Sequence, residues 1–217
     1  MDMTNYRFAA LALVLLAILT LQPGCKSRPA KADVLPTVDA ATQPAQPVLT
    51  APLLVEDYFT LDAQRVLEAC TPAVKLVFLC SPNNPTGNLL SEEAVLTIAR
   101  RLDGRALVVV DEAYVEFAPG KSLTRHVQSL PQLVILRTLS KAHGLAGARC
   151  GTLIANPEIV ALLRKVIPPY AITQLTVEAA MSLLEAPQLA LMRARIEEVR
   201  TERERMIRDF RELPDVK

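Results

Sequence analysis

Short apolar runs alternate with longer mixed stretches from about residue 52 to the end of the chain. The runs have the length and the β-branched content of buried strands, and they cover residues 76–80, 107–110, 133–137 and 151–155. The stretches between and after them predict helices over residues 61–70, 91–102, 156–167, 173–184 and 187–211. Buried strands that alternate with helices favour an α/β fold, here three layers (α/β/α) with a mostly parallel sheet covered on both faces.

Several of the predicted helices carry signals at their ends or along one face. Thr60 is a candidate N-cap of the first helix, and Ser91, followed by two acidic residues, is a candidate N-cap of the second. The last helix is densely charged except for one apolar stripe, which is typical of a long helix lined by solvent. The stripe keeps a spacing of three, four or seven and consists of Met192, Ile196, Val199, Met206 and Phe210.

The N-terminal part of the chain has a different composition. An apolar run over residues 8–21 is shorter than the roughly 20 residues of a bilayer-spanning helix, so it resembles the hydrophobic region of a signal peptide. Gly24 and Cys25 then resemble a bacterial lipoprotein cleavage site, which would place a lipid anchor on Cys25. The alternative is a wrongly assigned start or a fused segment that has no role in the fold.

Residues 26–51 are rich in Pro and Ala and predict an extended linker. We therefore expect four parts: an apolar segment over residues 1–25, this linker, a domain over residues 52–186, and a long linking helix over residues 187–217.

Charge and cysteine content narrow the classes of function. The chain has 24 Lys and Arg against 23 Asp and Glu, 4% aromatic residues and no Trp, so nothing indicates a nucleic-acid partner. None of the cysteines forms a Cys-x-x-Cys pair, so the spacing of a zinc or redox site is missing and no metal is expected. Cys70, Cys80 and Cys150 lie in or near apolar segments, which favours a reduced, cytosolic environment for the domain.

Polar residues suited to chemistry follow the first two predicted strands. Asn84 lies in an Asn-Pro-Thr-Gly stretch; its amide can donate to a ring hydroxyl, although the same stretch is typical of an ordinary turn. Asp111 follows the second apolar run, where an acid is costly to bury unless it is paired. It either caps a loop or pairs with a protonated pyridine nitrogen, in which case Tyr114 could reach a phenolic oxygen on the same ring.

A lysine flanked by hydroxyl and guanidinium groups follows the third predicted strand. Thr138 and Ser140 alternate with an apolar residue, so both hydroxyls can face a phosphate. Lys141 precedes an almost uncharged stretch, which predicts a partly buried amine able to condense with an aldehyde; the alternative is an ordinary surface lysine. Arg149 suits bidentate phosphate binding, or else forms a surface ion pair. His143 is interpreted as a polar loop residue without a role.

Taken in order along successive strands, these residues resemble the fold-type-I aminotransferases that use pyridoxal 5'-phosphate. The similarity is greatest to the histidinol-phosphate aminotransferase family. It covers residues 52–216 and rests on VFLCSPNNPTG, VVVDEAYVEF, ILRTLSKAHGLAGARCG and KVIPPYAI. The resemblance implies transfer of an amino group between glutamate and imidazole acetol phosphate in histidine biosynthesis, by a cytoplasmic homodimer. Two alternatives stay open: another aminotransferase or a decarboxylase of the same fold, or an exported, lipoprotein-like protein without enzymatic activity.

The resemblance also implies a role for each residue. Lys141 matches the lysine that holds the cofactor covalently and carries the proton during catalysis. Asp111 matches the partner of the pyridine nitrogen, which makes the ring an electron sink. The ring oxygen would be contacted by Tyr114 and Asn84. The phosphate would be bound by Thr138, Ser140 and Arg149.

Two portions that the resemblance leads us to expect are not found in this sequence. One is the start of the large domain, with a further phosphate loop, an aromatic ring that stacks on the cofactor, and a residue donated across the dimer. The other is the small domain, with the arginine that binds the substrate carboxylate. We therefore expect an unpaired sheet edge, exposed apolar faces, marginal stability or aggregation, weak cofactor binding and no substantial transamination by this chain.

Overall fold

The computed structural model describes residues 48–54, 58–120 and 122–213. The predicted apolar segment, the proposed lipidation of Cys25 and most of the predicted linker lie outside these residues. Within the described residues, no helix is long and apolar enough to cross a membrane.

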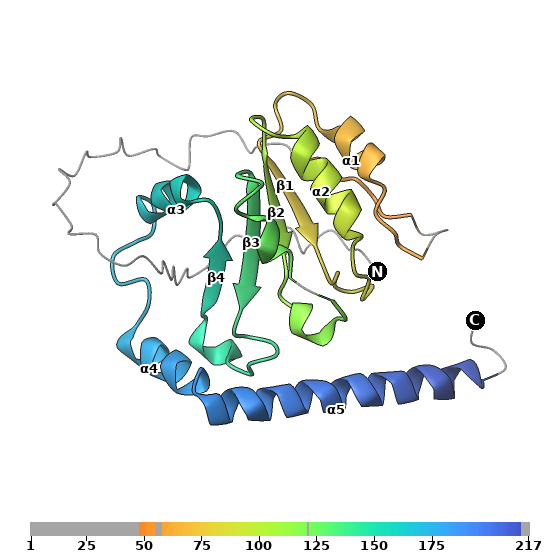
Figure 1. Ribbon diagram of the computed structural model, residues 1–217, viewed down its shortest axis with the longest axis vertical. Helices are drawn as coiled ribbons and strands as arrows, with labels where there is room; N and C mark the ends of the chain where they lie inside the picture. Colours follow the sequence, from red (N-terminus) through yellow and green to blue (C-terminus); the bar gives the residue numbers. More distant parts are fainter. Residues whose placement is uncertain (1–47, 55–57, 121, 214–217) are drawn as a thin grey trace, which may run out of the picture.

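A four-stranded sheet forms the centre of the structure (Figure 1). The strands lie side by side in chain order and comprise β1 (Leu76–Cys80), β2 (Leu107–Asp111), β3 (Leu133–Thr138) and β4 (Gly151–Ile154). Strand β1 pairs in parallel with β2, and β2 pairs in parallel with β3, whereas β4 is antiparallel to β3. The α/β class and the mostly parallel sheet predicted from the sequence are thus confirmed.

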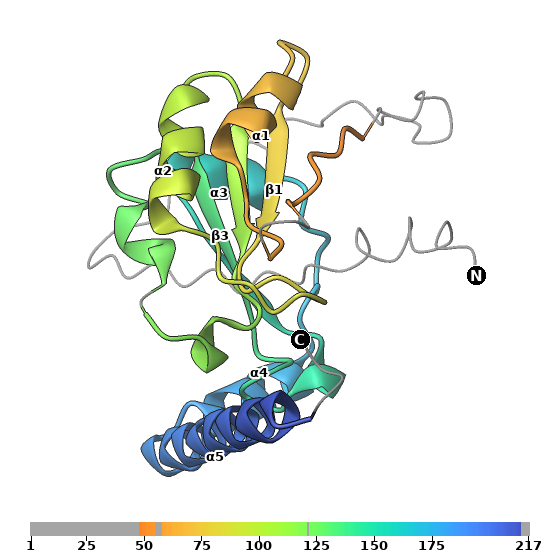
Figure 2. The ribbon, with the colours of Figure 1, turned by 90° about the vertical axis from the view of Figure 1, so that its right-hand side faces the viewer.

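Helices α1 (Ala63–Ala69) and α2 (Glu92–Arg101) pack together on one face of the sheet (Figures 1 and 2). Alternate strand residues point toward them, because successive side chains of a strand face opposite sides. The core between helices and strands is built from Val95, Ile98 and Leu102 of the α2 region and from Val77, Leu79, Val108, Val110, Leu133 and Ile135 of the sheet. The connection from β2 to β3 contains two 3-10 helices, η2 (Val115–Phe117) and η3 (Leu123–His126).

The opposite face of the sheet is buried only in its centre. Val109 of β2 and Val134 of β3 are buried there, but Phe78 of β1 is 64% exposed and Leu76 is 52% exposed. The prediction that both faces would be covered is therefore wrong at β1. This strand stands at the end of the sheet, with a pairing partner on one side only among the described strands.

Local capping agrees with the sequence at α2 and differs at α1. The Ser91 hydroxyl accepts a hydrogen bond from the amide of Ala94 at 3.4 Å, as predicted. At α1 the cap is Asp62, whose carboxylate accepts from the amides of Gln64 and Arg65. Thr60 was the wrong choice because the chain turns into the helix two residues later, and a carboxylate also suits the positive end of a helix.

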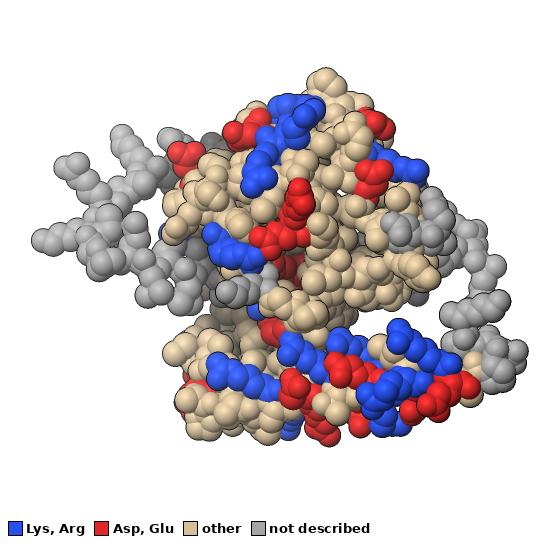
Figure 3. Space-filling view, turned by 45° about the vertical axis from the view of Figure 1, so that its right-hand side comes forward, with Lys and Arg blue, Asp and Glu red and all other residues tan. Residues whose placement is uncertain are grey.

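The chain continues from β4 into three further helices, α3 (Pro157–Arg164), α4 (Gln174–Leu183) and α5 (Ala186–Arg211). Helices α4 and α5 lie beyond the end of the sheet to which β1, β2 and β3 point (Figure 1). Acidic and basic side chains alternate along α5 at the bottom of Figure 3, as predicted for a solvated helix. Its apolar stripe is buried at Ile196 and about half exposed at Val199, Met206 and Phe210.

Candidate cofactor site

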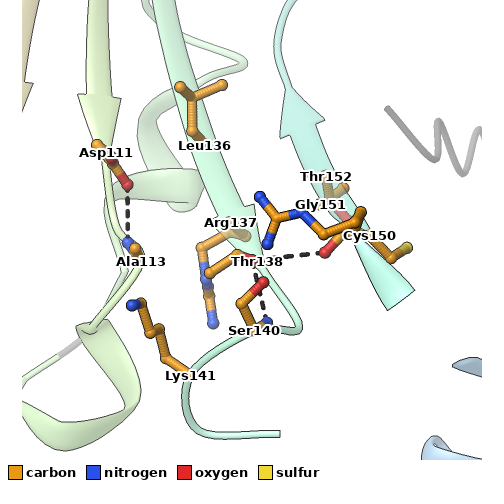
Figure 4. A pocket seen from close by; sticks show the side chains of 11 residues that line it. Asp111, Ala113, Leu136, Arg137, Thr138, Ser140, Lys141, Cys150, Gly151 and Thr152 are labelled. Carbon is orange, nitrogen blue, oxygen red and sulfur yellow. Dashed lines mark hydrogen bonds between the residues drawn. The ribbon is translucent and has the colours of Figure 1, made fainter. Parts of the chain in front are cut away.

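A cavity of about 280 Å³ opens at the carboxyl ends of β2 and β3, next to the start of β4 (Figure 4). In parallel sheets the carboxyl ends of the strands are the usual place for ligands. Five of the residues predicted from the sequence line this cavity: Asp111, Thr138, Ser140, Lys141 and Arg149. The remaining lining residues are Ala113, Leu136, Arg137, Cys150, Gly151 and Thr152.

The β2 side of the cavity carries the Asp111 carboxylate. Its Oδ1 accepts a hydrogen bond from the amide of Ala113 at 3.0 Å, which fixes the turn that follows the strand (Figure 4). Asp111 is half-buried, and it has no ion pair within the parts of the chain that the structure describes. The carboxylate is thus held at the rim of the cavity with a free oxygen for a cationic partner.

The β3 side is a turn stabilised by the Thr138 hydroxyl. This hydroxyl accepts from the amide of Ser140 at 3.0 Å and donates to the carbonyl of Cys150 at 3.4 Å (Figure 4). Thr138 therefore links the end of β3 to the start of β4, and only a lone pair of its oxygen is left for a ligand donor. The Thr138 hydroxyl therefore has no proton left to donate to a phosphate, and the predicted phosphate contact of Ser140 stays a prediction.

Lys141 is connected to the other two strand ends through Tyr114. Its Nζ lies 5.1 Å from the centre of the Tyr114 ring, a cation–π distance. The Tyr114 hydroxyl in turn accepts a hydrogen bond from Nδ2 of Asn84 at 3.3 Å. Tyr114 thus adjoins Lys141, and Asn84 is connected to Lys141 through Tyr114, although neither Tyr114 nor Asn84 lines the cavity. The expected partial burial of Lys141 is wrong: the residue is exposed, because the turn that carries it forms the open rim of the cavity.

Arg149 directly follows the short helix η4 (Ala146–Ala148), and it lines the cavity. Its φ of 52° places the backbone in the left-handed region, which is costly for a residue with a Cβ and is concentrated at functional sites. Its Nη1 donates to the carbonyl of Ala146 at 3.2 Å. The side chain is exposed and has no carboxylate partner among the described residues, so the predicted alternative of a surface ion pair is not observed.

A second group of charged residues is connected to the cavity through Arg137 and was not predicted from the sequence. Arg137, which lines the cavity, forms ion pairs with Glu116 at 2.6 Å and with Glu112 at 3.6 Å. His143 adjoins this group: burial lowers its pKa, the Glu116 carboxylate opposes this shift, and the Arg137 charge adds to it. The signal that could have revealed the Glu112–Arg137 ion pair is a charged residue at the end of each of two apolar runs, VVVDE and LVILR.

The cysteines of the described region are free thiols. Burial raises the pKa of Cys80 and of Cys150, so both stay protonated and are poor nucleophiles or metal ligands. Within the described residues no cluster of His, Cys, Asp and Glu could hold a metal ion. The chemistry of this site therefore rests on its amine, carboxylate, hydroxyl and guanidinium groups.

These groups fit pyridoxal 5'-phosphate. An amine (Lys141) and a carboxylate (Asp111) face the cavity without ionic partners among the described residues, as a ligand with an aldehyde and a protonated ring nitrogen requires. A hydroxyl and a guanidinium, on Ser140 and Arg149, suit its phosphate. The fold and the cavity together define an α/β protein with a lysine-containing cofactor site.

Comparison with known proteins gives the same class. The sequence matches the family model of aminotransferase class I and II over residues 38–216, and the chain belongs to this family. Its enzymes depend on pyridoxal 5'-phosphate, the cofactor predicted from the motifs.

Two relatives and one solved structure illustrate the similarity. A histidinol-phosphate aminotransferase of Sodalis glossinidius is 46% identical over 154 residues, 71% of this chain and 42% of that protein. One of Escherichia coli O1:K1 is 43% identical over 167 residues, 77% of this chain and 46% of that protein. The histidinol-phosphate aminotransferase structure from Clostridium acetobutylicum superposes with a TM-score of 0.62 at 22% identity, over 71% of this chain and 47% of that one. The chain thus spans less than half the length of these relatives.

Proposed function

We propose that this chain is the cofactor-binding part of a histidinol-phosphate aminotransferase. The observation that carries the proposal is the convergence of Asp111, Lys141 and Arg149 on one cavity, although they come from separate strand ends. The names of the relatives support the substrate class: an amino group would move between glutamate and imidazole acetol phosphate.

In this proposal the chain supplies charges and proton carriers around a cofactor that, when bound, provides an aldehyde and an electron-withdrawing ring. Asp111 would hold a proton on the ring nitrogen, because a carboxylate stabilises a cation beside it. Lys141 would hold the cofactor covalently through Nζ, because an amine is the group that combines with an aldehyde. It would then carry a proton from and to the substrate Cα, as a positioned general base.

The remaining site residues would orient the ring and its anionic tail. Tyr114, which accepts a hydrogen bond from Asn84, has its own hydroxyl proton left to donate to the ring oxygen. Ser140 would donate its hydroxyl proton to the phosphate, and Arg149 would add a guanidinium fork. Thr138 would contribute chiefly by holding the turn that presents Ser140.

The family also suggests how the protein works in the cell. We propose a cytoplasmic homodimer that acts on amino-acid and keto-acid substrates. We expect the present chain by itself to bind the cofactor weakly and to show no substantial transamination. The cavity is open, and among its lining residues none is aromatic, so nothing described here stacks on the ring.

Covalent capture of the cofactor tests the proposal directly. The full chain is incubated with pyridoxal 5'-phosphate, reduced with borohydride and mapped by mass spectrometry. We expect a pyridoxyl group on Lys141, and its loss in Lys141→Ala. Lys165→Ala is the matched control, because Lys165 is an exposed lysine directly after α3. Modification spread evenly over surface lysines, with no excess at Lys141, would contradict the proposed site.

A further inference from the structure

Glu112 is a buried carboxylate with an unusually complete set of partners. It is 2% exposed, and it follows Asp111 directly in the chain. Its two oxygens accept from the hydroxyl of Ser122 at 2.6 Å and from the amide of Leu123 at 2.7 Å. Its own amide donates to the carbonyl of Leu136 at 2.9 Å. Glu112 thus ties the end of β2 both to the loop before η3 and to the end of β3.

Arg137 connects this buried carboxylate to a second one. Its Nη1 lies 3.6 Å from Oε2 of Glu112, and its Nη2 lies 2.6 Å from Oε1 of Glu116. Both glutamates belong to the segment that follows β2, whereas Arg137 belongs to β3. The guanidinium therefore bridges the two strand ends that carry Asp111 and Lys141, and it does so at the wall of the cavity (Figure 4).

The segment around Glu116 is also held from outside. Arg200 of α5 donates from Nη2 to the carbonyls of Glu116, at 2.9 Å, and of Ala118, at 2.7 Å. Because η2 is fixed on this side, the position of Arg137 is set by the segment after β2. A buried charge that loses its partner is strongly destabilising. Arg137 and its two glutamates therefore favour the arrangement in which both ion pairs are kept.

We infer that Arg137 is a positioning residue for cofactor attachment. Held by Glu112 and Glu116, it keeps the turn of Lys141 at the separation from Asp111 at which the lysine meets the aldehyde carbon while the ring nitrogen meets the carboxylate. The inference rests on the proposed function, and it assigns Arg137 no contact with the reacting atoms. Outer partners that orient a ligand-holding residue have effects of about 10- to 100-fold at metal sites, which sets the scale expected here.

Two forms of the cofactor distinguish a positioning role of Arg137 from general damage to the fold. Pyridoxal 5'-phosphate condenses with Lys141, whereas pyridoxamine 5'-phosphate has the same ring and phosphate but an amine in place of the aldehyde. In Arg137→Met we expect the affinity for the aldehyde form to fall roughly tenfold more than the affinity for the amine form. We also expect less borohydride-trapped Lys141 at saturating aldehyde. Arg137→Lys should recover part of the lost affinity for the aldehyde form, because an ammonium keeps the charge. The recovery should be incomplete, because an ammonium cannot bridge both carboxylates as a guanidinium does.

Arg205→Met is the matched control. Arg205 also pairs with two carboxylates, Glu202 at 2.9 Å and Asp209 at 2.7 Å, but on the exposed surface of α5. It should leave both affinities within about twofold of the original. An equal loss of both affinities in Arg137→Met, or no loss, would overturn the positioning role while the proposed function stands. Failure of the unmutated chain to attach the aldehyde at Lys141 would overturn both.

Discussion

The Nζ of Lys141 lies 5.1 Å from the centre of the Tyr114 ring, although these residues follow different strands of the sheet. Tyr114 accepts a hydrogen bond from Asn84, which follows a third strand. These two contacts therefore connect three strand ends, and they place a phenol between the amine that would bind the cofactor and the amide that would help hold its ring.

Substitutions of Tyr114 should separate its two contacts. Tyr114→Phe keeps the ring beneath Lys141 and removes the hydroxyl, so we expect about a fivefold loss of pyridoxal 5'-phosphate affinity, the value of one ordinary hydrogen bond. Tyr114→Leu also removes the cation–π contact and should lose more. Fluorescence titration measures both, with Tyr170→Phe as control because Tyr170 is 97% exposed. Equal affinities for the Phe and Leu variants would argue against a role for the ring.

Asp111→Asn should weaken cofactor binding without disturbing the fold. The asparagine oxygen can still accept from the amide of Ala113, so the turn is kept and only the charge is lost. Because hydrogen bonds to charged groups are worth about 1.5–3 kcal/mol, we expect affinity to fall by roughly one to two orders of magnitude. Equilibrium dialysis against the cofactor measures the change, with Asp209→Asn as control. An unchanged affinity would remove Asp111 from the site.

The stability of the chain should decrease as pH falls below about 6.5 because of His143. Burial lowers the pKa of His143 in the folded protein below its usual value of 6.5, so the unfolded chain binds the proton more tightly. The stability that the folded protein gains from neutral His143 is fully present above pH 6.5. It is lost as the pH falls toward the lower pKa of His143 in the folded protein. Urea unfolding at several pH values, with and without His143→Gln, measures it; an identical pH dependence of the two proteins would contradict the prediction.

Arg200→Ala should loosen α5 from the rest of the molecule. Its guanidinium donates to the carbonyls of Glu116, Phe117 and Ala118, at the end of η2. The loss of these bonds should cost about 2 kcal/mol in the free energy of unfolding and make α5 more sensitive to limited proteolysis. Arg195→Ala, an exposed position on the same helix, is the control. Equal protease sensitivity of the two variants would show that α5 is held by other contacts.

Phe78→Lys should reduce aggregation of the chain. Phe78 is 64% exposed on β1, which is the end strand of the described sheet, and an exposed apolar edge strand is a template for pairing with another chain. A lysine there should lower light scattering at high concentration with little change in the unfolding midpoint. Val77→Lys is the opposite control, because Val77 lies in the core and its charge should unfold the domain. Unchanged scattering in Phe78→Lys would place the aggregating surface elsewhere.

The sequence by itself predicted the four strands and five of the residues that line the cavity. The apolar runs at residues 76–80 and 133–137 became β1 and β3, because a short continuous run of large apolar residues favours a strand, although one side of β1 stays exposed. The order of Asn84, Asp111 and Lys141 along successive strands predicted that they would lie at one edge of the sheet, since parallel strands end at the same edge. Their expected roles toward the cofactor came from family resemblance and stay predictions.

The tertiary structure alone decided which groups are exposed and which charges meet. Lys141 was expected to be partly buried from its apolar neighbours in sequence, but exposure depends on what packs above a turn, and the turn lies at an open rim. Arg137 meets Glu116 across 21 positions in the chain, a contact that no local pattern encodes. Apolar periodicity reports what each segment buries, whereas ion pairs between segments follow from the way that the segments are assembled.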